Sequence, residues 1–337
     1  MRPVRFGLAL EEGVRSLFYC WVREAVEGGE RFRAEDPCKY WRFSWEEDKY
    51  TFFRESRLVK PRGIVTVSLR SRGVYRYGFF QLHARLPEWE DGPMLWFGFE
   101  AEDLFGGGVA HFMFHSGELY AYTGAWGGLL RMKLPGFPED YGSRRHTYTV
   151  KVYRSLALWF IDSSLRGAAV LADSGEPRLV HEGPPYSIGI SPMKPASTLG
   201  VLLDIDGGDV SREWVWSDLH PWQVRVLEGD PSPSLLLELY EYGSGRRLRG
   251  VESEKPVVSH PLPSLEVEVD VLFKASGRGV LRVQSFTLSG EWEDVEVLRV
   301  PANEPILYRV GGRTPLVRVV YEPGERCRVE EAEAYLH

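Results

Sequence analysis

The chain has 337 residues and a formal net charge of −7 at pH 7. This length suits two domains, since one domain takes roughly 100–200 residues. The negative charge argues against nucleic acid as the main partner, because neutralising phosphates requires a basic face. No stretch of the sequence approaches the ~20 apolar residues of a membrane span, so we expect none.

The numbers of amide and cysteine residues indicate the environment in which the protein works. Asparagine occurs once and glutamine three times, which is typical of proteins from hot environments. Cys20, Cys38 and Cys327 show no CxxC spacing, so neither a zinc knuckle nor a disulfide scaffold is indicated. A Cys20–Cys38 bridge stays open, because hyperthermophiles form disulfides inside cells.

The N-terminal segment, residues 1–31, is predicted to pack on the first domain. Its stretch 8–26 has apolar residues at a helical spacing, and a strand over 17–22 is the alternative. Glu11 and Glu12 interrupt the apolar run, which argues against a cleavable signal peptide. We therefore expect a cytoplasmic protein, or an extracellular one if a leader has been removed.

Beyond residue 40 the sequence turns to short runs rich in Val, Tyr, Phe and Trp, bounded by Gly, Pro and Asp. Such runs predict a β-sandwich or jelly roll and not alternating strands and helices. The predicted strands are 63–69, 77–85, 95–99, 109–115, 119–123, 146–153, 156–161, 199–205 and 213–219.

A second series of strands follows a predicted linker at residues 228–234, where two prolines stand among small polar residues. Its predicted strands are 234–242, 265–273, 279–288, 294–300, 306–310, 316–321 and 327–335. The chain is thus predicted to be all-β, with a jelly-roll sandwich at 32–228 and a smaller β-sandwich at 235–337.

Residues 75–87, YRYGFFQLHARLP, resemble a strand of the laminarinase-like (family 16) glycoside hydrolases and their concanavalin-A-like relatives. Further similar segments occur in the same order at 36–41, 57–59, 91–96, 146–150 and 158–162. The resemblance covers about residues 32–222. It implies a concanavalin-A-like jelly roll whose concave sheet forms a cleft for a polysaccharide.

The resemblance also implies a catalytic strand, since retaining hydrolysis in this family uses two carboxylates about 5 Å apart. At alternate positions of the equivalent strand this sequence has His111, Met113 and His115, none of them a carboxylate. We therefore predict a glycan-binding protein without the family's hydrolysis. The three side chains are expected to face the cleft and contact sugar hydroxyls.

Three alternatives stay open at this point. The chain could be a glycoside hydrolase whose carboxylates come from Glu100, Glu102 or Glu118. It could be a structural or assembly protein that uses two sandwiches as interaction surfaces. A strand with His, Met and His on one face could also suit a soft copper site, although half-buried histidines explain the pattern as well.

Tryptophans divide into two groups. Trp96, Trp159 and Trp292 fit apolar strand positions and are predicted to lie in the core. Trp89 and Trp126 stand in polar or glycine-rich loops, where burial is less expected, and are predicted to be platforms for sugar rings.

Asp204, Asp206 and Asp209 flank a Gly-Gly turn and offer the hard oxygen ligands that calcium prefers. A structural calcium ion is the one cofactor that the sequence suggests, and an Asp-Gly hairpin turn is the alternative.

In the second domain, residues 289–297 and 315–336 are similar to strands of galactose-binding-like jelly rolls that serve as carbohydrate-binding modules. This similarity implies a second glycan-binding domain, but such modules also occur in adhesion and structural proteins.

Overall fold

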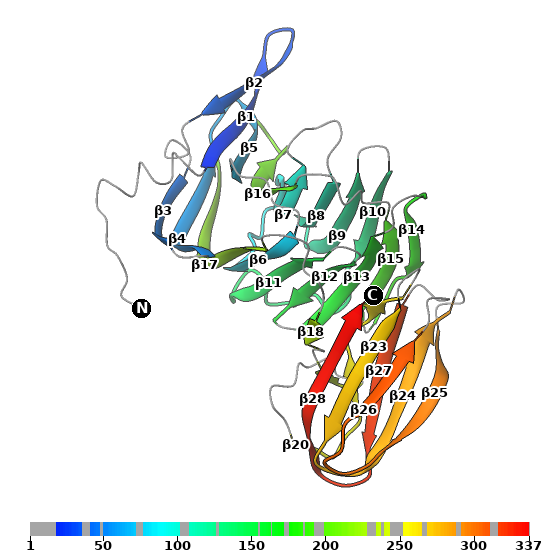
Figure 1. Ribbon diagram of the computed structural model, residues 1–337. Coiled ribbons are helices and arrows are strands. Elements are labelled where there is room, and N and C mark those ends of the chain that lie inside the picture. Colours follow the sequence, from blue (N-terminus) through cyan, green and yellow to red (C-terminus); the bar gives the residue numbers. More distant parts are fainter. Residues whose placement is uncertain are drawn as a thin grey trace.

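A computed structural model shows the chain as a series of twisted sheets (Figure 1). It describes residues 18–35, 41–47, 50–71, 77–101, 108–125, 128–153, 156–162, 164–171, 175–184, 186–191, 199–227, 234–236, 239–242, 252–264, 268–287, 291–310 and 316–336. None of these residues is helical, and no described segment forms a helix that could cross a membrane. The predicted all-β fold, a jelly-roll sandwich followed by a second sandwich, is confirmed.

Two large sheets make the first sandwich. Among the described residues, sheet A has eight strands: β10 (Gly128–Lys133), β9 (Glu118–Ala125), β8 (Gly108–His115), β7 (Met94–Ala101), β16 (Leu199–Asp206), β5 (Ile64–Ser71), β1 (Phe18–Val26) and β2 (Gly29–Glu35). The nine described strands of sheet B are β14 (Arg178–His181), β15 (Ser187–Ser191), β13 (Ser164–Leu171), β12 (Leu156–Ile161), β11 (His146–Val152), β6 (Tyr77–Ala84), β17 (Trp214–Leu227), β4 (Tyr50–Lys60) and β3 (Trp41–Glu47). The strands of each sheet are named in the order in which they lie side by side.

The main core fills the space between sheets A and B. Phe97 of sheet A stacks on Phe112 at 5.1 Å and meets Tyr148 and Trp216 of sheet B at 5.6 and 5.7 Å. Trp159 of sheet B belongs to the same core and is fully buried, as predicted. Alternate residues of each strand point inward, which is why the opposite face of sheet A is left for other contacts.

Two smaller sheets, C and D, make the second sandwich. In the described part, sheet C contains β18 (Ser234–Leu236), β28 (Cys327–Leu336), β23 (Val269–Ala275), β26 (Ile306–Val310) and, beside β28, β20 (Glu252–Ser253). Sheet D contains β19 (Leu239–Glu241), β21 (Val257–Ser259), β27 (Leu316–Pro323), β24 (Gly279–Phe286), β25 (Trp292–Val300) and, beside β27, β22 (Leu262–Pro263). Phe273 and Tyr321, 4.9 Å apart, lie in the core between these sheets.

The two sandwiches also share a buried apolar layer, which we call the junction cluster. Strand β12 is buried on both faces: Trp159 points into the main core, whereas Leu158 and Phe160 point toward the second sandwich. In Figure 1 the yellow-to-red strands accordingly lie against the green strands of sheet B. The junction cluster consists of Leu156, Leu158, Phe160, Leu165, Ala168, Val170, Tyr186, Ile188, Val258, Phe286, Leu316 and Val320.

The helix predicted over residues 8–26 is wrong for its described part. Phe18–Val26 is strand β1, which pairs with β5 and β2. Cys20 and Val22 point into the main core, so a period of two applies here. Pairing with a strand distant in sequence outweighs the local apolar spacing. Residues 1–17 lie outside the described residues, as does Cys38 of the Cys20–Cys38 bridge that the sequence leaves open.

Candidate functional site

The outer face of sheet A, turned away from sheet B, gathers polar and aromatic side chains from strands far apart in sequence. On β8, Ala110, Phe112 and Phe114 enter the main core, so the alternate residues point outward. These are His111, Met113 and His115, which share one face as predicted. A two-residue turn at Ser116 and Gly117, both with positive φ, ends β8 and fixes its register with β9.

Neighbouring side chains cover His111 on this face. Its ring lies 4.9 Å from that of Trp96 and 5.9 Å from that of Tyr122, and only 3% of the residue is exposed. Its Nδ1 lies 3.4 Å from Glu100 Oε2, and neither ring nitrogen meets hydrogen-bond criteria with a partner in the described part of the chain. Burial lowers the pKa of His111 to about 3, so the ring is neutral at neutral pH. Met113 is equally buried, whereas His115 is exposed.

Trp96 lies on the outer face and not in the core, so that prediction is wrong. Leu95 and Phe97 on either side of it point into the core, and Trp96 is half-buried. Its ring meets that of Tyr122 edge to face at 5.3 Å. A strand residue flanked by two core residues belongs to the opposite face, which the sequence alone could have shown.

Asp204 lies at the centre of the face. Strand β16 inserts between β7 and β5, which places Asp204 opposite Trp96 on one side and Ser68 on the other. The residue is 6% exposed, and its Oδ1 has no hydrogen-bond partner among the described residues. Burial, supported by the negative charges of Asp206 and Glu100, raises its pKa well above the ordinary 3.8. Asp204 therefore favours the protonated carboxylic acid, a proton donor.

The two other aspartates of the predicted calcium site have different partners. Asp206 accepts a hydrogen bond from Arg23 at 2.7 Å. Asp209 accepts hydrogen bonds from the backbone and hydroxyl of Ser211 at 2.8 and 2.9 Å, and these lower its pKa. No group of three metal-ligating side chains exists among the described residues, and the calcium ion stays a prediction.

More aromatic side chains lie on the far side of Asp204. Trp21 points outward from β1, between the core residues Cys20 and Val22. Its ring stacks on that of Phe32 of β2 at 5.8 Å, and Phe32 is 48% exposed. The outer face thus has aromatic rings on both sides of a buried carboxyl group.

The remaining predicted site residues lie elsewhere or carry other contacts. Glu118, toward the edge of the sheet, forms an ion pair with Lys133 at 2.6 Å and accepts a hydrogen bond from Tyr120. These contacts lower its pKa, which suits a fixed anion and not a proton donor. Trp89 packs against the main core, 5.4 Å from the ring of Trp214. Glu102 and Trp126 lie outside the described residues.

No family model and no curated protein matches the chain. Among solved structures, it is similar to a β-glucanase from Bacillus licheniformis, with 13% identity and a TM-score of 0.36 over 51% of this chain and 79% of that one. A laminarinase from Rhodothermus marinus is 12% identical, with a TM-score of 0.36 over 52% of this chain and 78% of that one. A family 16 endo-glucanase from Bacteroides ovatus is 12% identical, with a TM-score of 0.39 over 63% of this chain and 95% of that one. The chain is similar to these solved structures, of which the Bacteroides ovatus enzyme is a family 16 glycoside hydrolase. The likeness of its second sandwich to carbohydrate-binding modules stays a prediction.

Proposed function

We propose that the outer face of sheet A binds a polysaccharide or another glycan. One observation carries this proposal: aromatic side chains lie on both sides of Asp204, with Trp96 and Tyr122 toward β9 and with Trp21 and Phe32 toward β2. The CH faces of sugar rings pack on such aromatic rings, and the polar groups between them can bind hydroxyls.

The extent of the face suits a chain of sugars. Six strand spacings separate β9 from β2 among the described strands, which is roughly 29 Å at the usual spacing of 4.7–4.9 Å. This exceeds one sugar ring, so an oligosaccharide would contact both aromatic groups at once. Buried polar groups without partners are rare and call for a functional explanation, and Asp204 Oδ1 has none in the part of the chain that the structure describes.

The test is calorimetric titration of the full chain with β-glucan, galactan and chitin oligosaccharides. Trp96→Ala and Tyr122→Ala should each weaken binding about tenfold, which is ~1.4 kcal/mol. Leu307→Ala, which removes a 68% exposed apolar side chain from sheet C, should leave the affinity unchanged. If a folded protein binds none of these glycans and forms a defined oligomer in light scattering, the structural role replaces glycan binding.

Hydrolysis is the second candidate, and the raised pKa of Asp204 favours it. A glycosidase needs one carboxylic acid that donates a proton and a second carboxylate nearby. The negative charge of Glu100 raises the pKa of Asp204, so the two carboxyl groups interact electrostatically. Against this, β8 presents no carboxylate on the outer face at residues 109–115, which favours binding without hydrolysis.

The two candidates separate in an assay for released reducing ends. Binding alone releases none from any glycan of the panel. Hydrolysis through these carboxylates predicts release by the natural chain and its loss in both Asp204→Asn and Glu100→Gln. Glu118→Gln is the matched control, because Glu118 is already held by Lys133. Release that survives both of the first two substitutions would exclude Asp204 and Glu100 as the catalytic pair.

A further inference from the structure

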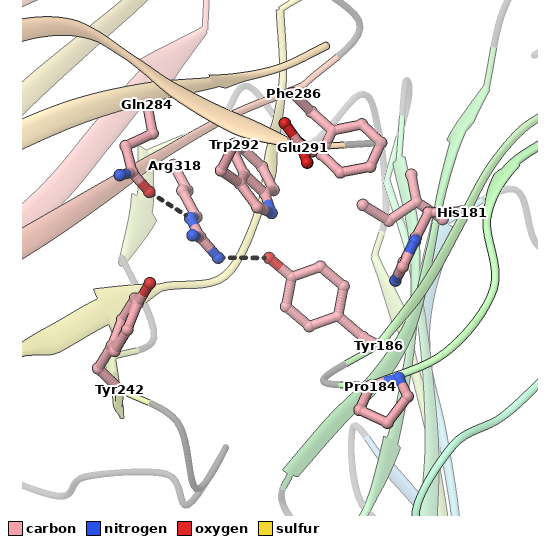
Figure 2. Close-up of a pocket in the computed structure, with 10 residues that line it drawn as sticks. His181, Pro184, Tyr186, Tyr242, Gln284, Phe286, Glu291, Trp292 and Arg318 are labelled. Carbon is pink, nitrogen blue, oxygen red and sulfur yellow. Dashed lines mark hydrogen bonds between the residues drawn. The ribbon is translucent and has the colours of Figure 1, made fainter. Parts of the chain in front are cut away.

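A pocket opens between the two sandwiches (Figure 2). The first sandwich contributes His181, Tyr186 and Ile188, and the second contributes Tyr242, Trp292 and Arg318. Its volume of about 310 Å³ lies at the small end of the ~300–1,000 Å³ of ligand pockets. Such a pocket accommodates a ligand of about one sugar ring.

Arg318 is an unusual member of this pocket. It stands on β27 between Leu316 and Val320 of the junction cluster, and the residue is only 6% exposed. Buried charges are normally paired with an opposite charge. Within the described part of the chain, however, no carboxylate forms an ion pair with Arg318.

A neighbouring arginine shows the contrast. Arg282 on β24 is the more exposed of the two, yet it has two carboxylate partners, Asp294 at 2.7 Å and Glu322 at 2.9 Å. Arg318 instead donates from Nε to Gln284 Oε1 at 2.8 Å and from Nη1 to Tyr186 Oη at 3.4 Å. Both acceptors are neutral, and although Glu291 also lines the pocket, no described carboxylate lies within ion-pair distance of Arg318.

The guanidinium retains unused donors. It has five N–H groups, and the two hydrogen bonds to Gln284 and Tyr186 occupy one on Nε and one on Nη1. The two N–H groups of Nη2 have no acceptor among the described residues, and Arg318 lines the pocket. Figure 2 shows the guanidinium at the pocket, opposite Tyr186. A carboxylate is the acceptor that this planar fork fits best.

Aromatic rings line the pocket beside Arg318 and can pack on the apolar part of a ligand. The guanidinium carbon lies 4.2 Å from the ring centre of Trp292 and 5.7 Å from that of Tyr242. Tyr242 is half exposed, so its ring can also be contacted by a ligand. Glu291 and His181 also line the pocket and can bind hydroxyl groups. Arg318 is the one arginine or lysine among the described lining residues, which suits one negative charge better than a phosphate dianion.

We propose that this junction pocket binds a hexuronic acid, whose carboxylate pairs with Arg318 and whose ring packs on the aromatic side chains. The same carboxylate can come from a free hexuronate or from the end of an acidic polysaccharide. The proposal does not depend on glycan binding by the outer face of sheet A.

The test is calorimetric titration of the full chain with glucuronate and galacturonate, beside glucose, galactose, acetate and phosphate at equal ionic strength. At least one hexuronate should bind, and the neutral hexoses, acetate and phosphate should bind at least about tenfold more weakly, because each lacks the ring or the single charge. An oligogalacturonide that binds more tightly than the monomer identifies a polysaccharide end as the source.

Variants assign the binding to the pocket. Arg318→Lys keeps the charge but loses the fork, and should weaken hexuronate binding about tenfold or more. Tyr242→Ala alters an exposed wall without touching the buried cluster, so it tests the pocket even if Arg318→Lys unfolds; it should weaken binding severalfold. Arg299→Gln removes an exposed positive charge from neighbouring β25 and is the matched control.

Several results would overturn the proposal. They are equal binding of hexuronate and neutral hexose, binding of acetate as tight as that of hexuronate, or unchanged affinity in Tyr242→Ala and in folded Arg318→Lys. Trp96→Ala separates this site from the outer face: hexuronate binding that Trp96→Ala abolishes belongs to the outer face, and the junction pocket is then not the site.

Discussion

Trp159 donates a hydrogen bond from its indole nitrogen to the backbone carbonyl of His111, at 3.1 Å across the main core. The contact joins β12 of sheet B to β8 of sheet A, beneath the outer face. The outer-face position of His111 is therefore anchored from inside the sandwich, by a residue with no part in the face itself.

Trp159→Phe should destabilise the protein by about 2–4 kcal/mol. The substitution removes a donor from a buried carbonyl and leaves a void in a fully packed site. Equilibrium unfolding in denaturant measures this change, and hydrogen exchange should show faster exchange in β8. A loss below about 0.5 kcal/mol would mean that the hydrogen bond does not hold the two sheets together.

Gly98→Ala should cost more than about 1 kcal/mol, because a Cβ at this position would lie 2.7 Å from the Cα of His111. Gly29→Ala is the matched control, since Gly29 has a similar φ of 151° against 143° but open space around it. The difference between the two variants in thermal unfolding isolates the steric clash. Equal losses would attribute the effect to φ alone.

His111→Phe should change how stability depends on pH. The pKa of His111 falls from its ordinary 6.5 to about 3 in the folded protein, so the unfolded chain binds more protons between these values. The natural chain therefore loses stability as the pH falls from 6.5 toward 3, and the variant lacks this component. Denaturant unfolding at several pH values should show the variant gaining stability, relative to the natural chain, on acidification. Parallel curves would contradict a buried neutral histidine.

Asp204→Asn should change the pH dependence of stability in the opposite direction. Because folding raises the pKa of Asp204 above 3.8, the folded chain binds more protons above that pH. The stabilisation that the Asp204 carboxyl contributes is present below pH 3.8 and is lost as the pH rises through its pKa in the folded protein. The Asn variant should therefore gain stability over the natural chain as the pH rises. A gain that grows on acidification instead would place the carboxyl in a solvated or paired state.

The sequence predicts the fold class and the shared face of His111, Met113 and His115, because alternation with a period of two is local information. It does not predict that Trp96 and Tyr122 cover His111, since that requires the order of neighbouring strands. The sequence suggests Asp204 as a metal ligand and does not show that it is a buried acid, because β16 inserts between β7 and β5, two strands that come much earlier in the chain.

Two further features of the sequence indicate the contact between the sandwiches. The uninterrupted apolar run at residues 156–161 is typical of a strand buried on both faces, and it could have predicted the junction cluster. Arg318 stands alone in the apolar run Leu316–Tyr321, where a charge is costly. Trp292 was predicted as a core residue; the structure shows it half-buried, at the rim of the core and in the junction pocket.

The junction cluster determines how this chain can be divided. A truncated protein ending near residue 228 would expose Leu156, Leu158 and Phe160 of β12 to water, as an apolar stripe beside Val170 and Ile188. Exposed stripes of this kind cause aggregation. The gene is therefore better expressed whole, and failure of an isolated first sandwich to stay in solution would reflect the cut and not a defect of its own core.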